Sequence, residues 1–172
     1  MTSNLIIGLL MKDANYWIEN LNLQAHPEGG YFKETYRSED TVLNKYGKNR
    51  SASTGIYFLI TSANFSAFHK IESDEMWHFH GGSPLVVYVL MPDGELNILK
   101  IGNDLEKGQT PQAIVPAGCW FASRVEAPNS YSFVGCTVAP GFDFQDFVLA
   151  NRDELTAEYP KHKEIIQELT RF

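Results

Sequence analysis

Cysteine and basic residues are both scarce in this sequence. Only Cys119 and Cys136 occur in 172 residues, and a chain of this length buries enough apolar surface to fold without disulfides. We therefore expect two buried thiols rather than a disulfide or a redox pair. Fourteen Lys and Arg stand against 21 Asp and Glu, which gives a formal charge of −7. The general electrostatic attraction that nucleic acids and anionic membranes require is missing, so we expect neither as a partner.

Long apolar runs are also missing from the sequence. The run from Leu5 to Met11 covers only seven residues, which is too short to span a bilayer. No basic region precedes it and no small-residue cleavage site follows it, so it is a poor signal peptide. These features predict a cytoplasmic protein. Met11 is an alternative start, which leaves open whether residues 1–10 are native.

The composition favours one folded domain over the whole chain. Hydrophobic residues make up 44% and aromatic residues 13% of the sequence, which is enough for a sizeable core. Asp13 is a suitable N-cap for an amphipathic helix over about 13–22. Pro160, at a first-turn position, predicts a C-terminal helix over about 153–170.

Between these helices, over about 30–150, short runs of β-forming residues alternate with turn residues. This rhythm predicts an all-β jelly roll or closed sandwich, a fold that can hold a small ligand between its sheets. The polar stretch 38–50 is expected to be a long loop. The predicted strands are Tyr31–Arg37, Ser53–Ile60, Phe65–Ile71, Glu75–His80, Leu85–Met91, Glu95–Ile101, Gln112–Val115, Cys119–Arg124, Ser130–Val138 and Phe142–Leu149.

Three of the five histidines, His69, His78 and His80, lie within twelve residues. A hairpin that carries His69 on one strand and Glu75 at the start of the next would bring an imidazole and a carboxylate together. Such a pair can bind a metal or act as a base and its orienting group. We therefore take His69 and Glu75 as the leading site residues.

Strand parity separates the other two histidines from this pair. On a regular strand, residues two apart share a face. His78 and His80 therefore point one way, while Glu75, Trp77 and Phe79 point the other. Without a bulge, His78 and His80 cannot join Glu75 in one site, and we expect them to support the structure.

The hairpin also resembles the first conserved motif of the cupin superfamily. That motif has a glycine, His-x-His, three or four residues, a glutamate, six residues and a glycine. His69, Glu75 and Gly82 match it, whereas Ile71 stands where the second histidine belongs. The stretch Pro116–Phe121 is similarly close to the second motif, Pro-x-Gly-x-x-His.

In that second motif Phe121 replaces the final histidine. Two of the four usual metal ligands are thus absent, so the resemblance implies no metal cofactor. His69 and Glu75 remain weak candidates for a metal, with His26 as a third ligand.

Longer strings resemble one cupin family in particular, the domain of unknown function DUF-985 (cupin type 5). The strings are His26–Phe32, Ser66–Gly82, Val115–Trp120 and Val134–Phe144, in that order over about 120 residues. The resemblance implies a jelly roll and a homodimer, for which the predicted strand Tyr31–Arg37 is suited to add onto a partner's sheet. The family is compared mainly with dTDP-sugar 3,5-epimerases, germins and auxin-binding proteins.

The epimerase comparison implies roles for individual residues. In those enzymes a histidine removes a proton next to a keto group and a tyrosine returns one, without a metal. His69 matches the base, and Tyr131 is our candidate for the acid. Arg37, Lys33 and Arg124 are available to hold the diphosphate of a nucleotide sugar.

Three functions therefore remain open for a chain with a small-molecule ligand. The first is a metal-independent isomerase or epimerase with His69 as base, acting on a sugar-like substrate. The second is a non-catalytic binding protein, whose ligand would contact aromatic residues near the expected cavity. The third is a metalloenzyme that uses His69 and Glu75. The candidate aromatic contacts are Trp77, Phe79, Trp120 and Phe121.

Overall fold

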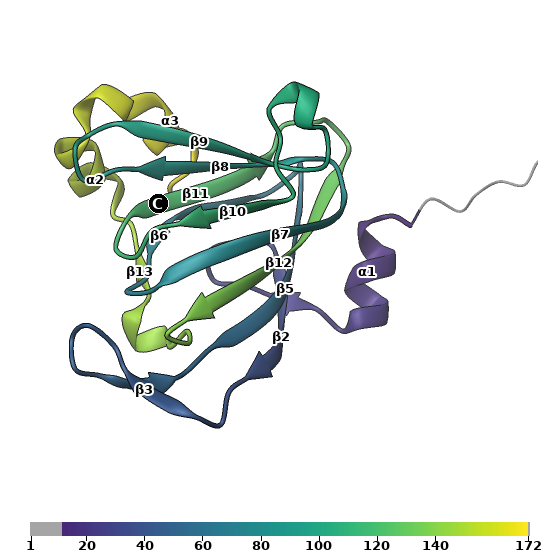
Figure 1. Cartoon of the computed structure of the whole chain (residues 1–172). Helices are drawn as coiled ribbons and strands as arrows, with labels where there is room; N and C mark the ends of the chain where they lie inside the picture. The colour runs from purple at the N-terminus through teal and green to yellow at the C-terminus, as the bar shows by residue number, and fades with distance from the viewer. Residues whose placement is uncertain (1–11, 172) are drawn as a thin grey trace, which may run out of the picture.

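The structure, a computed structural model that describes residues 12–171, consists of two antiparallel β-sheets that face each other (Figure 1). The larger sheet contains, in spatial order, β1 (Gln24–Ala25), β2 (Tyr31–Arg37), β5 (Thr54–Thr61), β12 (Tyr131–Ala139), β7 (Asp74–Gly82) and β10 (Gln112–Val115). The smaller sheet contains β13 (Val148–Leu149), β6 (Phe65–Lys70), β11 (Trp120–Val125), β8 (Leu85–Leu90) and β9 (Leu96–Ile101). Neighbouring strands are often distant in sequence, as in a jelly roll, and the all-β prediction is confirmed.

The main core lies between the two sheets, where side chains from alternate strand positions interdigitate. Phe58, Trp77, Val89 and Phe121 belong to it, and each is almost fully buried. Strand β8 is buried along its whole length, because the outer face of the smaller sheet is covered as well. The sequence of β8, an unbroken apolar run, reflects this burial on both faces.

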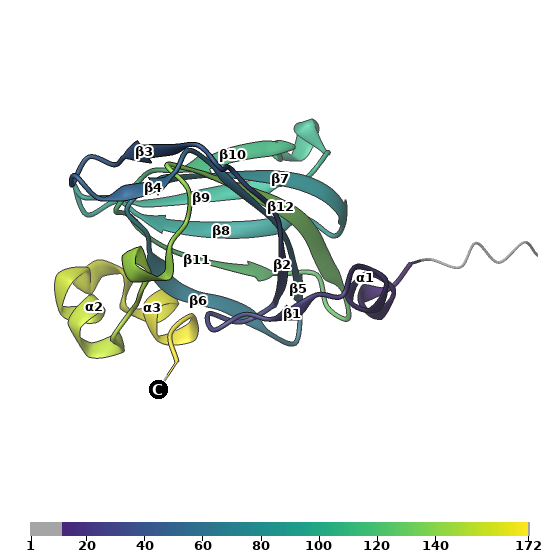
Figure 2. The same ribbon diagram turned by 90° about the horizontal axis from the view of Figure 1, so that it is seen from below.

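Two C-terminal helices provide that cover, α2 (Arg152–Glu158) and α3 (Lys163–Glu168) (Figure 2). The sequence predicted a single helix over 153–170, and this prediction is wrong because the segment forms two helices. Pro160 disfavours helical geometry at the residue before it, and Tyr159 has φ −123° and ψ 65°. A short 3₁₀ turn, Pro160–His162, therefore separates the two helices.

The N-terminal helix α1 (Ala14–Leu21) packs on the outer face of the larger sheet. Asp13 caps it as predicted, since its side chain accepts a hydrogen bond from the Tyr16 N–H at 2.8 Å. Trp17 stacks on Phe133 of β12 with ring centroids 4.6 Å apart. Figure 1 shows α1 and the C-terminal helices on opposite sides of the molecule.

Two segments differ from the sequence-based expectation. The expected loop 38–50 contains a hairpin, β3 (Thr41–Leu43) and β4 (Asn49–Ser51). The expected strand Phe142–Leu149 is reduced to β13, and a 3₁₀ turn, Phe144–Asp146, precedes it. The Asp143 side chain caps this turn by accepting the Gln145 N–H at 2.9 Å, which competes with extended structure. A further 3₁₀ turn covers Leu105–Lys107.

Both cysteines are free and buried, as predicted. Over residues 12–171, none of the helices combines the length and the apolar character needed to cross a bilayer. The apolar run Leu5–Met11 and the alternative start at Met11 lie outside the described residues.

Candidate functional site

A cavity of about 260 Å³ lies between β6 of the smaller sheet and strands β2, β5, β7 and β12 of the larger one. The segment 142–147 forms a further wall. Most of the polar residues that line the cavity are ionisable, so both charge and shape decide what enters. The lining consists of His26, Glu28, Phe32, Glu34, Arg37, Thr54, Ile56, His69, Ile71, Glu75, Cys136, Val138, Phe142, Asp143, Phe144 and Phe147.

His69 and Glu28 form a buried ion pair in this cavity. His69 Nε2 lies 2.9 Å from Glu28 Oε2, and His69 Nδ1 lies 2.7 Å from the carbonyl oxygen of Ala67. Burial alone would lower the pKa of His69, but the Glu28 carboxylate outweighs it and raises that pKa. Burial would raise the pKa of Glu28, yet His69 holds it below its ordinary value. The pair is therefore an imidazolium and a carboxylate.

This geometry argues against the expected role of His69 as a base. Both ring nitrogens donate protons, one to Ala67 and one to Glu28, so neither offers a lone pair to a substrate. The expected partner of His69 also changes, because the carboxylate paired with it is Glu28 rather than Glu75. Both glutamates nevertheless line the same cavity.

Glu75, at the start of β7, is only 8% exposed. Burial and the negative charge of Glu28 raise the pKa of Glu75 to about 7, although His69 and a hydrogen bond from the Cys136 thiol oppose this shift. The cavity thus contains two carboxyl groups of different character. Glu28 remains charged, whereas Glu75 exchanges a proton near neutral pH.

His26 is the fourth ionisable residue of the inner cavity, beside His69, Glu28 and Glu75. Its Nδ1 accepts the Glu28 backbone N–H at 3.3 Å, which assigns the proton of the neutral ring to Nε2. Burial lowers the pKa of His26, while Glu28 raises it less and His69 lowers it further. The ring is therefore neutral near pH 7 and carries one N–H donor.

Glu28 lies in the string His26–Phe32, which carries part of the family resemblance, but it is not among the site residues expected from the sequence. Gly29 and Gly30 follow it with φ of 114° and 77°, values that glycine adopts without strain. A side chain on Gly29 would overlap the Phe65 carbonyl. The signal that could have identified Glu28 is a carboxylate directly before two glycines, a pattern that allows close approach to another strand.

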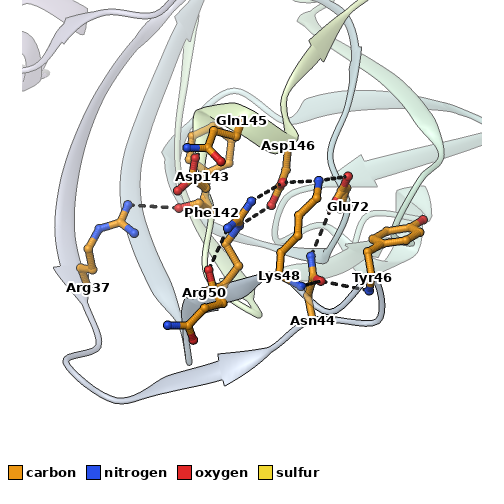
Figure 3. A network of polar contacts seen from close by, with 11 residues as sticks. Arg37, Asn44, Tyr46, Lys48, Arg50, Glu72, Phe142, Asp143, Gln145 and Asp146 are labelled. Carbon is orange, nitrogen blue, oxygen red and sulfur yellow. Dashed lines mark hydrogen bonds and ion pairs between the residues drawn. The ribbon is translucent and has the colours of Figure 1, made fainter.

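Of the five ligand contacts expected from the sequence, Arg37 is the one that lines the cavity. Its Nε and Nη2 donate to the two Glu34 oxygens at 2.9 and 2.7 Å. Its Nη2 also donates to the Phe142 carbonyl at 3.1 Å (Figure 3). The charge of Arg37 is thus already balanced by Glu34.

A second polar cluster fixes the 142–147 wall. Lys48 and Arg50 from the β3–β4 hairpin converge on Asp146 (Figure 3). Arg50 Nε and Nη2 lie 2.7 Å from the two Asp146 oxygens, and Lys48 Nζ lies 3.1 Å from Asp146 and 2.7 Å from Glu72. The hairpin therefore ties the aromatic wall to the body of the protein.

The expected aromatic contacts lie elsewhere. Phe121 packs on His69 with ring centroids 4.1 Å apart, and Trp77 lies behind Phe121 in the core. Phe79 packs against the same core. Trp120 is on the outer face of its sheet, where Lys70 lies 4.4 Å from its ring centroid. None of these four lines the cavity.

Strand parity on β7 is confirmed for His78 and His80. His78 bonds Thr137 and Gln112 at 2.9 Å each. His80 contacts the rings of Tyr57 and Phe133, which pack under α1. Neither histidine reaches the cavity.

Three other candidates also lie away from the cavity. The Tyr131 hydroxyl donates to the Lys12 carbonyl at 2.6 Å and accepts the Trp17 indole N–H at 3.0 Å. It is therefore not placed across the cavity from His69 as the expected acid. Lys33 donates to the Leu21 carbonyl, and Arg124 pairs with Glu168.

The donor set does not fit a cupin metal. Ile71 and Phe121, at two ligand positions of the superfamily, have no donor atoms, and His69 uses both of its nitrogens. Among the described residues, no three His, Cys, Asp or Glu side chains come together in a way that could hold a metal ion.

Comparison with known proteins identifies the family and agrees with the fold. Residues 15–150 match the family model described as the cupin superfamily (DUF985). An uncharacterized protein of Saccharomyces cerevisiae is 36% identical over 154 residues, which cover 80% of this chain and 76% of that protein.

Two solved structures are similar over almost their whole length. A hypothetical protein from Leishmania major superposes with a TM-score of 0.89 at 36% identity, over 93% of this chain and 99% of that one. A protein from Shewanella oneidensis superposes with a TM-score of 0.86 at 42% identity, over 94% and 99%.

Proposed function

We propose that this chain, which belongs to the DUF985 family of the cupin superfamily, is a metal-independent isomerase or epimerase that acts on a small sugar-like carbonyl compound. The observation that carries the proposal is the position of Glu75, a buried carboxyl group that lines the cavity without an ion pair among the described residues. Beside it, Glu28 and His69 already neutralise each other. Glu75 is thus the cavity group that is free to move a proton.

The proposed reaction transfers one proton out and one back. Glu75 in its carboxylate form takes the proton from a carbon next to the substrate carbonyl, and the C–H electron pair forms an enolate. His26 Nε2–H donates a hydrogen bond to the developing enolate oxygen. When the first carbon carries a hydroxyl group, the hydroxyl proton moves to the enolate oxygen and Glu75 returns its proton to the former carbonyl carbon. The first carbon thereby becomes the carbonyl and the isomer is formed, whereas return of the proton to the first carbon from the same face would regenerate the substrate. A group with a pKa near 7 is well matched to both transfers at neutral pH.

Solvent deuterium exchange tests the proposal directly. A panel of keto and aldo sugars, their amino derivatives and nucleotide sugars is incubated with the protein in D₂O and chelator, and deuterium on carbon is measured by NMR. We expect exchange with at least one substrate, and a loss of roughly 10²- to 10⁴-fold in Glu75→Gln.

The matched control is His78→Gln on the outer face of the same strand, which should exchange at the parent rate. Undiminished exchange in Glu75→Gln would assign the base elsewhere. Complete absence of exchange with every compound, in a parent protein that still binds a ligand, would favour the second candidate function.

That second candidate is ligand binding without chemistry. Four phenylalanines line the cavity, Phe32, Phe142, Phe144 and Phe147, and apolar walls with a few polar groups are typical of small-molecule sites. Both candidates place the ligand in the same cavity.

We also expect a homodimer. Within residues 12–171, strand β1 pairs with Tyr31 and Phe32 of β2 alone, so residues 33–37 form an exposed sheet edge there. Such edges are usually paired or covered. Sedimentation velocity over a dilution series should give twice the single-chain mass at micromolar concentration, and a single-chain mass throughout would contradict the expectation.

A further inference from the structure

We infer that the ligand of this cavity is a small organic cation, a molecule with an ammonium group that the 142–147 wall and Asp143 recognise. The inference deepens the proposed function and rests on its choice of cavity, because it assigns a charge to the substrate. It follows from two independent features of the lining, namely its balance of charges and the arrangement of its aromatic rings.

Among the described residues, four cations in and around the cavity are matched in number by four carboxylates, although Lys48 also contacts Asp146. The pairs are His69–Glu28, Arg37–Glu34, Lys48–Glu72 and Arg50–Asp146. Two carboxyl groups of the lining, Glu75 and Asp143, are left over. Asp143 feels the charges of Arg37 and Arg50 nearby, but each of these already has its own carboxylate. The lining thus carries an excess of negative charge.

Three rings of the wall form a corner. The planes of Phe142 and Phe144 meet at 81°, those of Phe144 and Phe147 at 71°, and those of Phe142 and Phe147 at 69°. Their centroids lie 4.9, 6.1 and 6.4 Å apart in the same order. All three rings line the cavity, and aromatic rings that line a site bind quaternary ammonium groups through their faces, which attract positive charge.

Asp143 lies in the chain between two of these rings, Phe142 and Phe144, and lines the cavity with them. A cation in the corner would therefore have a carboxylate next to the ring faces. This arrangement leaves Glu75, deeper in the cavity, free for proton transfer. An aminated sugar-like compound would satisfy both groups.

The same charges disfavour the nucleotide sugar that the epimerase comparison implied. A diphosphate needs unpaired cations, but Arg37 is held bidentately by Glu34, and Lys33 and Arg124 lie away from the cavity. The formal charge of −7 on the chain also attracts cations rather than anions.

Three probes of one shape test the inference. Choline carries a trimethylammonium group, 3,3-dimethylbutan-1-ol is its uncharged carbon isostere, and 3,3-dimethylbutanoate is a related anion. Affinities for the full chain are measured by isothermal titration calorimetry at constant ionic strength. We expect choline to bind about tenfold or more tightly than the alcohol, and the anion to bind more weakly than both.

Two conservative variants locate the cation. Asp143→Asn keeps the cap of the 3₁₀ turn, because asparagine caps equally well, and removes only the charge. Phe144→Leu replaces a side chain that is 54% exposed, so the fold should tolerate it. Each should weaken choline binding by about threefold or more and leave the alcohol unaffected. The matched control Asp93→Asn, in a turn where Asp93 accepts the Glu95 N–H, should change neither affinity.

Equal affinity for choline and the alcohol, tighter binding of the anion, or no binding of choline would overturn the inference. So would a choline affinity that neither variant lowers. These results are separate from those of the exchange test. Choline selectivity without deuterium exchange would retain the cation site and reject the isomerase, and exchange confined to uncharged or anionic sugars would do the reverse.

Discussion

Replacing Glu28 by glutamine is expected to lower the free energy of unfolding by about 3–5 kcal/mol near pH 6. Glu28 is 6% exposed and its carboxylate pairs with His69, which is 3% exposed. Its other oxygen accepts the Ser66 hydroxyl at 3.0 Å. Glutamine keeps the size and the contact with Ser66, but it leaves a buried imidazolium without a counter-charge.

The pH dependence of this loss follows from the two pKa shifts. The pKa of Glu28 is lowered from 4.5, so its contribution is present above that value and disappears as pH falls through the folded-state pKa. The pKa of His69 is raised from 6.5, so its contribution is present below 6.5 and disappears as pH rises through the folded-state pKa. The difference between parent and variant should therefore be greatest between about pH 4.5 and 6.5.

Denaturant unfolding over a pH series measures this difference. The control is Glu34→Gln, which removes the same charge from an exposed pair with Arg37 and should cost less than about 1 kcal/mol. A cost for Glu28→Gln no greater than the control, or one that does not decline at low pH, would show that the buried pair does not stabilise the fold.

The sequence predicts the jelly roll well because its signals are local. Alternating apolar residues and turn residues place nine of the strands close to their observed positions, and parity alone turns Glu75 and Trp77 inward and His78 outward. The segment 142–149 fails because its aromatic residues alternate like those of a strand. Its conformation is decided by the Asp143 cap and by the ties from Asp146 to the distant Lys48 and Arg50.

The site is harder to predict, because its partners are distant in sequence. His69 and Glu75 could be found from the hairpin, and they do line one cavity. Glu28 precedes His69 by 41 positions, and only the close approach of its Gly-Gly turn to β6 brings the two together. The aromatic load near the cupin motifs instead fills the core. Three of the aromatic rings that line the cavity come from the 142–147 segment, where the sequence contains no catalytic or metal-binding motif.

The second large effect is a gain in stability when Glu75 is replaced by glutamine. The pKa of Glu75 rises from 4.5 to about 7 because of burial and the charge of Glu28. The folded state therefore favours the protonated form. Below pH 4.5 the group is protonated whether the chain is folded or unfolded, and it carries no penalty. Between pH 4.5 and about 7 the unfolded chain ionises while the folded chain still holds the proton, so stability declines over this interval. Above about pH 7 the folded chain buries the charge and the full penalty is present.

Glutamine has the shape of the protonated acid and never ionises, so the variant avoids this penalty. The rise of the pKa from 4.5 to about 7 corresponds to about 3 kcal/mol, which for a domain of this size raises the melting temperature by about 6–12 °C at pH 8. Differential scanning calorimetry from pH 4 to pH 9 should show the two proteins converging near pH 4, separating progressively between about pH 4.5 and 7, and remaining apart above that. In the background of Glu28→Gln, the difference in stability should shrink and move to lower pH, because the repelling charge is gone.

A Glu75→Gln variant less stable than the parent at pH 8 would mean that Glu75 is held as a favourable carboxylate, and the proton transfer proposed for it would lose its physical basis. Stabilisation together with loss of exchange is the pattern expected of a group kept in the cavity for chemistry at a cost to the fold.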